Sequence, residues 1–201
     1  MSVYPVPAQF HQVEEVIKNS RFITQVFPVQ DSNHAKQIIQ QQKAAYPDAR
    51  HHCSAFVAGA PSNSNEYGFS DDGEPSGTAG KPMLAVLQGS GLGEVLAISI
   101  RYFGGVKLGT GGLVKAYAGG VKLALETLPT IEKVIRQEYQ LTCEYHQFDQ
   151  IQYWLKQHDG LIIETNYADN VRLLLALDAT NSENFANKLK DMQLSLQKLQ
   201  K

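Results

Sequence analysis

The feature that most constrains the fold is a glycine-rich segment set between two apolar patterns. Residues 95–100 are nearly all apolar, which is typical of a central strand covered on both faces. Residues 104–112 contain five glycines, and after them apolar and small residues recur at helical spacing up to residue 124. The sequence therefore predicts a strand, a glycine-rich loop and a helix that begins near residues 110–112.

This segment is also basic. Residues 101–122 contain Arg101, Lys107, Lys115 and Lys122 but no acidic residue. Glycines let a ligand approach the backbone, and free N–H groups at a helix start attract anions with the help of the helix dipole. One interpretation is therefore a phosphate site, for a small molecule or an RNA backbone.

The other interpretation is that the glycines serve tight turns and close packing of the helix on the sheet. Gly119 and Gly120 fall inside the predicted helix. They favour this second interpretation, because glycine inside a helix costs about 1 kcal/mol relative to alanine unless something needs the space.

Aromatic residues flank the glycines. Tyr102 beside Arg101 is the pair best suited to stacking on a nucleobase next to a phosphate, although packing in a core is the commoner fate of aromatic residues. The residues predicted to bind an anion or RNA are Lys81, Arg101, Tyr102, Gly104, Gly105, Lys107, Gly109, Thr110, Gly111, Gly112 and Lys115, with Lys122 as a weaker candidate.

A second long segment, residues 61–81, is rich in Ser, Asn, Gly and Asp and predicts a loop. Its Gly80-Lys81 pair does not make a phosphate-binding P-loop. Pro75 stands where the first glycine belongs, and Pro82 stands where Ser or Thr should bind magnesium.

The same loop carries three acidic residues close together. Asp71, Asp72 and Glu74 are weak metal candidates, since the spacing of a calcium-binding loop is absent. A solvated acidic loop is the favoured interpretation. Alternatively the loop folds against the basic segment, where the opposite charges partly neutralise each other.

The sequence contains no complete catalytic or metal-binding motif. His51, His52 and Cys53 are possible metal ligands, but adjacent residues on a strand point to opposite faces and cannot hold one ion together. No Gly-x-Ser-x-Gly nucleophile elbow occurs. We therefore expect no metal, no cofactor and no catalytic residue.

Composition narrows the classes of function. The 201 residues carry a net charge of −2, so any RNA contact must come from a local patch rather than from a generally basic surface. The two cysteines lie far apart and do not indicate a disulfide framework. The opening residues lack the pattern of a signal peptide, and the apolar runs are too short to span a bilayer. We expect a cytoplasmic protein without membrane contact.

The second half of the chain has a different pattern. Residues 139–145 alternate apolar and polar side chains, as half-buried strands do, and Val171, Leu173, Leu175 and Leu177 recur at every second position. A turn at residues 168–170 predicts a hairpin between the later strand and the one before it. With two helical patterns the order is β-α-β-β-α-β, that of a ferredoxin-like domain. The boundary lies near residues 129–136.

Three stretches resemble a known family: residues 70–82 (SDDGEPSGTAGKP), residues 101–105 (RYFGG) and residues 108–117 (LGTGGLVKAY). With Ser20-Arg21-Phe22 nearer the N-terminus, they identify the chain as similar to the YigZ/IMPACT family. The resemblance implies an α+β fold of two domains. Residues 1–133 would be similar to domain IV of elongation factor G, and residues 137–201 would be a ferredoxin-like domain similar to domain V of that factor.

The resemblance to a translocation factor suggests contact with RNA or the ribosome. The leading hypothesis is a non-catalytic accessory or regulatory protein of translation, which binds RNA or the ribosome through its basic glycine-rich face. One alternative is an enzyme acting on a phosphorylated small molecule, with Asp71, Asp72 or Glu74 as metal ligand or base. The other is a protein-interaction module that docks a protein partner on the same face.

Overall fold

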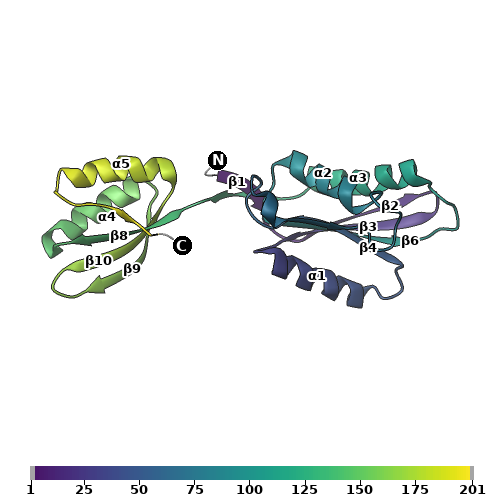
Figure 1. Cartoon of the computed structure of the whole chain (residues 1–201), viewed down its shortest axis with the longest axis horizontal. Coiled ribbons are helices and arrows are strands. Elements are labelled where there is room, and N and C mark those ends of the chain that lie inside the picture. The colour runs from purple at the N-terminus through teal and green to yellow at the C-terminus, as the bar shows by residue number, and fades with distance from the viewer. Residues whose placement is uncertain (1–2, 200–201) are drawn as a thin grey trace. The chain divides into compact units, whose positions relative to one another are not determined.

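The computed structural model describes residues 3–199 and divides into two compact units, Tyr4–Lys133 and the residues from Val134 onward (Figure 1). Each unit has its own sheet, helices and core. Strands β1 (Val3–Pro7) and β7 (Thr130–Val134) form a separate two-stranded sheet. The predicted two-domain α+β architecture is confirmed.

The first unit is built on an antiparallel sheet in the order β2-β3-β6-β4-β5. Its strands are β2 (His11–Ile17), β3 (Ser20–Pro28), β6 (Val95–Tyr102), β4 (His51–Val57) and β5 (Tyr67–Ser70). The apolar run predicted to be a central strand is β6, which is buried along its length except at Tyr102. The segment predicted as one long loop contains β5 and a short 3-10 helix (Ser64–Glu66), so the loop prediction was wrong there.

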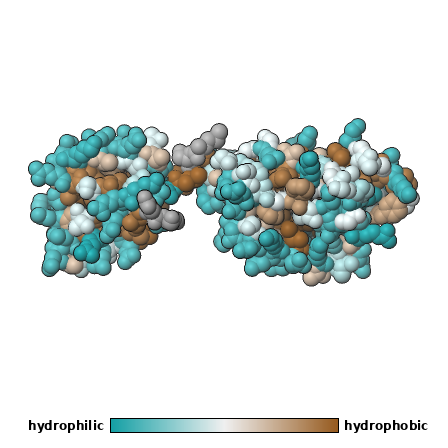
Figure 2. All heavy atoms as spheres, viewed as in Figure 1, coloured by the Kyte–Doolittle hydropathy of each residue, from teal (hydrophilic) through white to brown (hydrophobic). Residues whose placement is uncertain are grey.

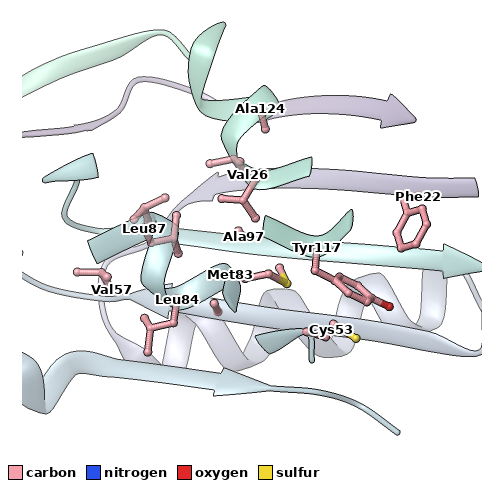
Figure 3. Close-up of a cluster of buried hydrophobic side chains, with 14 of the residues drawn as sticks. Phe22, Val26, Cys53, Val57, Met83, Leu84, Leu87, Ala97, Tyr117 and Ala124 are labelled. Carbon is pink, nitrogen blue, oxygen red and sulfur yellow. The ribbon is translucent and has the colours of Figure 1, made fainter. Parts of the chain in front are cut away.

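Helices cover both faces of this sheet. Helix α1 (Ser32–Ala45) covers one face, while α2 (Gly80–Ser90) and α3 (Thr110–Glu126) cover the other (Figure 1). The core beneath α2 and α3 includes Met83, Leu87 and Tyr117 (Figure 3). Their side chains fill the space between these two helices and the sheet. Helix α3 begins at Thr110, as predicted from the glycine-rich segment.

The two glycines inside α3 differ in their surroundings. A Cβ at Gly120 would lie 2.5 Å from Oγ1 of Thr24 on β3, so close packing on the sheet requires this glycine. A Cβ at Gly119 would meet nothing within 4 Å. The packing interpretation is therefore right for Gly120 and wrong for Gly119.

The second unit has the predicted ferredoxin-like order, with a sheet ordered β11-β8-β10-β9. Strands β9 and β10 form the expected antiparallel hairpin. Helices α4 and α5 bury Ile151, Leu155, Phe185 and Leu189 in the core of this unit. The elements are β8 (Gln137–Cys143), α4 (Phe148–Gln157), β9 (Leu161–Tyr167), β10 (Val171–Leu177), α5 (Ala179–Lys190) and β11 (Gln197–Lys198).

Among the described residues, no helix has the length and apolar character that crossing a membrane requires.

Candidate anion-binding site

A depression of about 360 Å³ lies in the first unit, where the glycine-rich loop enters α3. The acidic loop forms one of its walls, so the two segments singled out in the sequence meet here. The residues that line it are Glu74, Pro75, Arg101, Phe103, Lys107, Leu108, Gly109, Thr110 and Leu113.

Arg101 forms the floor of this region and is only 5% exposed. Its Nη1 donates to Oε1 of Glu74 at 2.6 Å, and its Nη2 donates to Oγ of Ser20 at 3.3 Å. Its guanidinium carbon lies 5.4 Å from the ring centroid of Phe22 and 5.6 Å from that of Phe103, within the range of cation–π attraction. The alternative interpretation, in which the acidic loop folds against the basic segment, is confirmed at this pair, and the favoured interpretation of a solvated loop was wrong for Glu74. A phosphate that reached Arg101 would have to compete with Glu74.

Glu74 joins Arg101 to α3. The same Oε1 accepts a hydrogen bond from the hydroxyl of Tyr117 at 2.7 Å. The pKa of Tyr117 lies far above its ordinary value. Burial is the largest cause, and the neighbouring Cys53 thiol and Glu74 carboxylate raise the pKa further. Tyr117 therefore stays protonated and keeps donating, so the network ties the acidic loop to the helix that opens at the depression.

The glycine-rich loop leaves the start of α3 open. Gly105 and Gly109 have φ of 86° and 76°, in the left-handed region that favours glycine. Gly109 is the N-cap residue and has no side chain with which to cap the first turn of the helix. A Cβ at Gly111 would meet nothing within 4 Å. Because the first N–H groups of a helix lack helical partners and carry the positive end of its dipole, this end suits an anion.

Gly104 serves the fold rather than a ligand. A Cβ there would lie 2.0 Å from the backbone carbonyl of Asn19, and its N–H donates to Oγ of Ser20 at 3.2 Å. A Cβ at Gly112 would lie 3.1 Å from Cβ of Leu108, which is tighter than an ordinary van der Waals contact. Gly104 is thus required by its close approach to the turn between β2 and β3, whereas Gly112 lies inside α3.

The predicted lysines are dispersed. Lys107 lines the depression, and Lys115 is exposed on the second turn of α3. Lys81 is exposed on α2 and Lys122 on the later part of α3, outside the depression. Within residues 3–199 these four lysines form no ion pair, so their charges are available to a ligand.

Tyr102 is not brought to the depression. It packs against the core on the α1 side of the sheet, with the guanidinium carbon of Arg21 5.7 Å from its ring centroid. Phe103, which lines the depression and is 50% exposed, is the aromatic residue in position to stack. Successive residues of a strand point to opposite sides of the sheet, so residues 101 and 103 share one side and residue 102 lies on the other. This alternation could have predicted that Phe103, and not Tyr102, lies beside Arg101.

The side chain of Asp71, in the acidic loop, caps the N-terminus of α2. Its carboxylate accepts hydrogen bonds from the backbone N–H groups of Gly77, Ala79 and Gly80 at 2.7, 3.0 and 2.8 Å. Burial works to raise the pKa of Asp71, but these three hydrogen bonds outweigh it, and the pKa lies below its ordinary value.

Asp72 ties the loop to α1 and β4. It accepts from Nζ of Lys43 at 2.6 Å and from the backbone N–H of His52 at 2.7 Å. Burial again opposes these donors, and the net pKa of Asp72 is lowered. Among the residues that the structure describes, no three His, Cys, Asp or Glu side chains are grouped to hold a metal ion, so the weak metal candidates are accounted for by these separate contacts.

The chain matches two family models. The model of the Impact N-terminal domain matches residues 18–125, and the model of a domain of unknown function (DUF1949) matches residues 141–192. Both segments of the candidate site lie within the first match.

Two curated relatives match the chain over most of their length. The chain is 52% identical over 191 residues to the IMPACT family member YigZ of Escherichia coli, covering 95% of this chain and 94% of the relative. It is 44% identical over 189 residues to an IMPACT family member of Haemophilus influenzae, covering 94% and 92%. A crystal structure described as that of a hypothetical protein is 50% identical, with a TM-score of 0.75, and covers 100% of this chain and 99% of that one.

Proposed function

The chain belongs to the IMPACT family, and from that premise we propose that it is a non-catalytic accessory or regulatory protein of translation, which binds RNA or the ribosome through the depression at the start of α3. The observation that carries the proposal is the open first turn of α3, with exposed Lys107 and Phe103 beside it. The proposal includes a cytoplasmic location, where translation takes place.

Each part of the depression suits one part of a nucleotide. The backbone N–H groups at the start of α3 and the ammonium of Lys107 can both donate to phosphate oxygens. The exposed ring of Phe103 can stack on an unpaired base, an interaction that contributes about 1–3 kcal/mol per base. Lys115 extends the positive surface by about one helical turn.

The charge of the acidic loop does not oppose this proposal. Glu74 is paired with Arg101, Asp72 with Lys43, and Asp71 with three backbone N–H groups. The lysines on α2, the loop and α3 have no such partner among the described residues. The local surface is therefore positive although the chain as a whole carries a net charge of −2.

The enzyme alternative has less support. It relies on Asp71, Asp72 or Glu74 as a base or ligand, and each of these carboxylates already accepts hydrogen bonds that hold the loop in place. No specific contact favours it over RNA binding.

Sedimentation of the tagged chain through a sucrose gradient of cell lysate tests the proposal. The measurement is made at low and moderate salt, with and without ribonuclease. We expect co-migration with ribosomal particles or RNA that weakens as salt rises, because phosphate contacts release counterions. Protein that stays at the top of every gradient would contradict the proposal and turn attention to small phosphorylated ligands.

A further inference from the structure

A second and larger concavity of about 770 Å³ runs between α2 and α3 on their exposed side, apart from the depression. Its lining is mainly apolar and small. Six residues form most of it: Ala85, Val86, Gly89, Val114, Ala118 and Leu125. Figure 2 shows apolar side chains at the surface over the region of α2 and α3, among polar ones.

The surface of this groove is shallow because its side chains are short. Beside Ala85 and Ala118, a Cβ at Gly89 or at neighbouring Gly119 would meet nothing within 4 Å. The chain's own packing therefore does not require glycine at these two positions, although glycine inside a helix costs about 1 kcal/mol relative to alanine. Short side chains permit a third helix to approach the two helices closely.

The rim of the groove is basic. Lys122 lines it, and Lys115 lies seven positions earlier on α3, about two turns away on the same side. Lys81 lies four positions before Ala85 on α2, one turn away on that side. Glu126, which also lines the groove, is the one acidic residue in the two helices, and none of the three lysines forms an ion pair with a described residue.

We propose that the α2–α3 groove is the docking site for an amphipathic helix of a partner protein, with an apolar stripe that fills the groove and acidic residues that meet the three lysines. The 11 residues of α2 give a groove about 16 Å long, which accommodates about three turns of such a helix. The charge of the rim selects an acidic partner and disfavours a basic one. The lining of the groove shares no residue with the lining of the depression that carries the proposed RNA binding, although Lys115 borders both. Variants at Ala118 and Lys122 therefore test the groove alone, and either proposal can fail without the other.

A designed peptide tests this directly by fluorescence anisotropy with the full chain. The peptide has about 18 residues, with leucines at i, i+3, i+4 and i+7 and glutamates on the flanking positions. One comparison peptide has lysines in place of the glutamates, and another has the same composition in scrambled order. We expect the acidic amphipathic peptide to bind at least about tenfold more tightly than either comparison peptide.

Variants locate the binding. Ala118→Glu places a charge and extra volume in the groove and should weaken binding at least about tenfold, while Lys122→Glu should weaken it severalfold. Ala118→Gln adds volume without charge and should also weaken it. Lys36→Glu, an exposed charge reversal on α1 across the sheet, is the matched control and should leave binding unchanged. Circular dichroism checks that each variant is folded.

Three results would overturn the proposal. The first is absence of binding by the acidic peptide, or equal binding of the scrambled one. The second is binding that Ala118→Glu and Ala118→Gln leave unchanged. The third is a dimer of the chain alone that Ala118→Glu dissociates in sedimentation, because the groove would then belong to a second copy.

Discussion

Glu74 and Arg101 form a buried ion pair, with Oε1 and Nη1 2.6 Å apart and both side chains almost fully covered. The pair joins the acidic loop to the end of β6, directly before the glycine-rich loop. Because Glu74 also accepts from Tyr117 on α3, one carboxylate holds together the three segments that shape the candidate site.

Removing the charge of Glu74 should destabilise the first unit. Glu74→Gln leaves Arg101 buried without its counter-charge, and loss of one member of a buried pair lowers the free energy of unfolding by about 3 kcal/mol. Urea denaturation followed by circular dichroism measures the change. Glu132→Gln, an exposed carboxylate on β7, is the control and should change stability little. Equal stability of the two variants would mean that the ion pair does not hold the loop.

The contribution of Asp71 to stability should disappear in acid. Since its pKa is lower in the folded protein than its ordinary value of 3.8, its charged form stabilises the fold above that value, and the contribution is lost as the pH falls through the folded pKa. The difference in unfolding free energy between the wild type and Asp71→Asn should be full above about pH 5 and should shrink below pH 4. A difference that stays constant from pH 7 to pH 3 would contradict this account.

Cys53 should be unreactive in the folded protein. Its thiol is buried and donates to the carbonyl oxygen of Asp71 at 3.0 Å, and burial raises its pKa to about 12. Since the thiolate is the reactive form, iodoacetamide at pH 8 should modify Cys53 only after unfolding in urea. Mass spectrometry of the labelled peptide checks this, and rapid labelling of the native chain would show that the site opens.

Two glycine substitutions should have opposite effects. Gly104→Ala would place a Cβ 2.0 Å from the Asn19 carbonyl and should lower the free energy of unfolding by about 3 kcal/mol or prevent folding. The Cβ that Gly119→Ala adds would meet nothing within 4 Å, so this substitution should raise the free energy of unfolding by about 1 kcal/mol. Thermal and urea denaturation measure both changes. Destabilisation by Gly119→Ala would mean that this glycine has an internal role.

Local patterns were enough to predict much of the fold. Strand β6, the glycine-rich loop and the start of α3 are contiguous, so their burial and helical periodicity can be read from adjacent residues. The β-α-β-β-α-β order of the second unit follows from alternation in β8 and β10 in the same way. In contrast, β5 has only four residues and depends on pairing with β4, a contact that its own sequence does not reveal.

The site was less predictable because it depends on which distant groups meet. The sequence favoured a solvated acidic loop and offered contact with the basic segment only as an alternative. It did not indicate that Glu74 would pair with Arg101 and remove Arg101 from the exposed surface. The site also depends on which face of the sheet each side chain at the end of β6 occupies. Phe103 lies at the depression, whereas Tyr102 packs against the core on the α1 side.

The affinity of the full chain for a labelled single-stranded RNA, measured against salt concentration, tests the central claim most directly. Lys107→Glu combined with Lys115→Glu should weaken binding by about 100-fold or more and reduce the slope of log affinity against log salt by about two, while Lys36→Glu should leave both unchanged. If the double variant binds RNA as tightly as the wild type, or if the wild type does not bind RNA at low salt, the glycine-rich face is not an RNA-binding site.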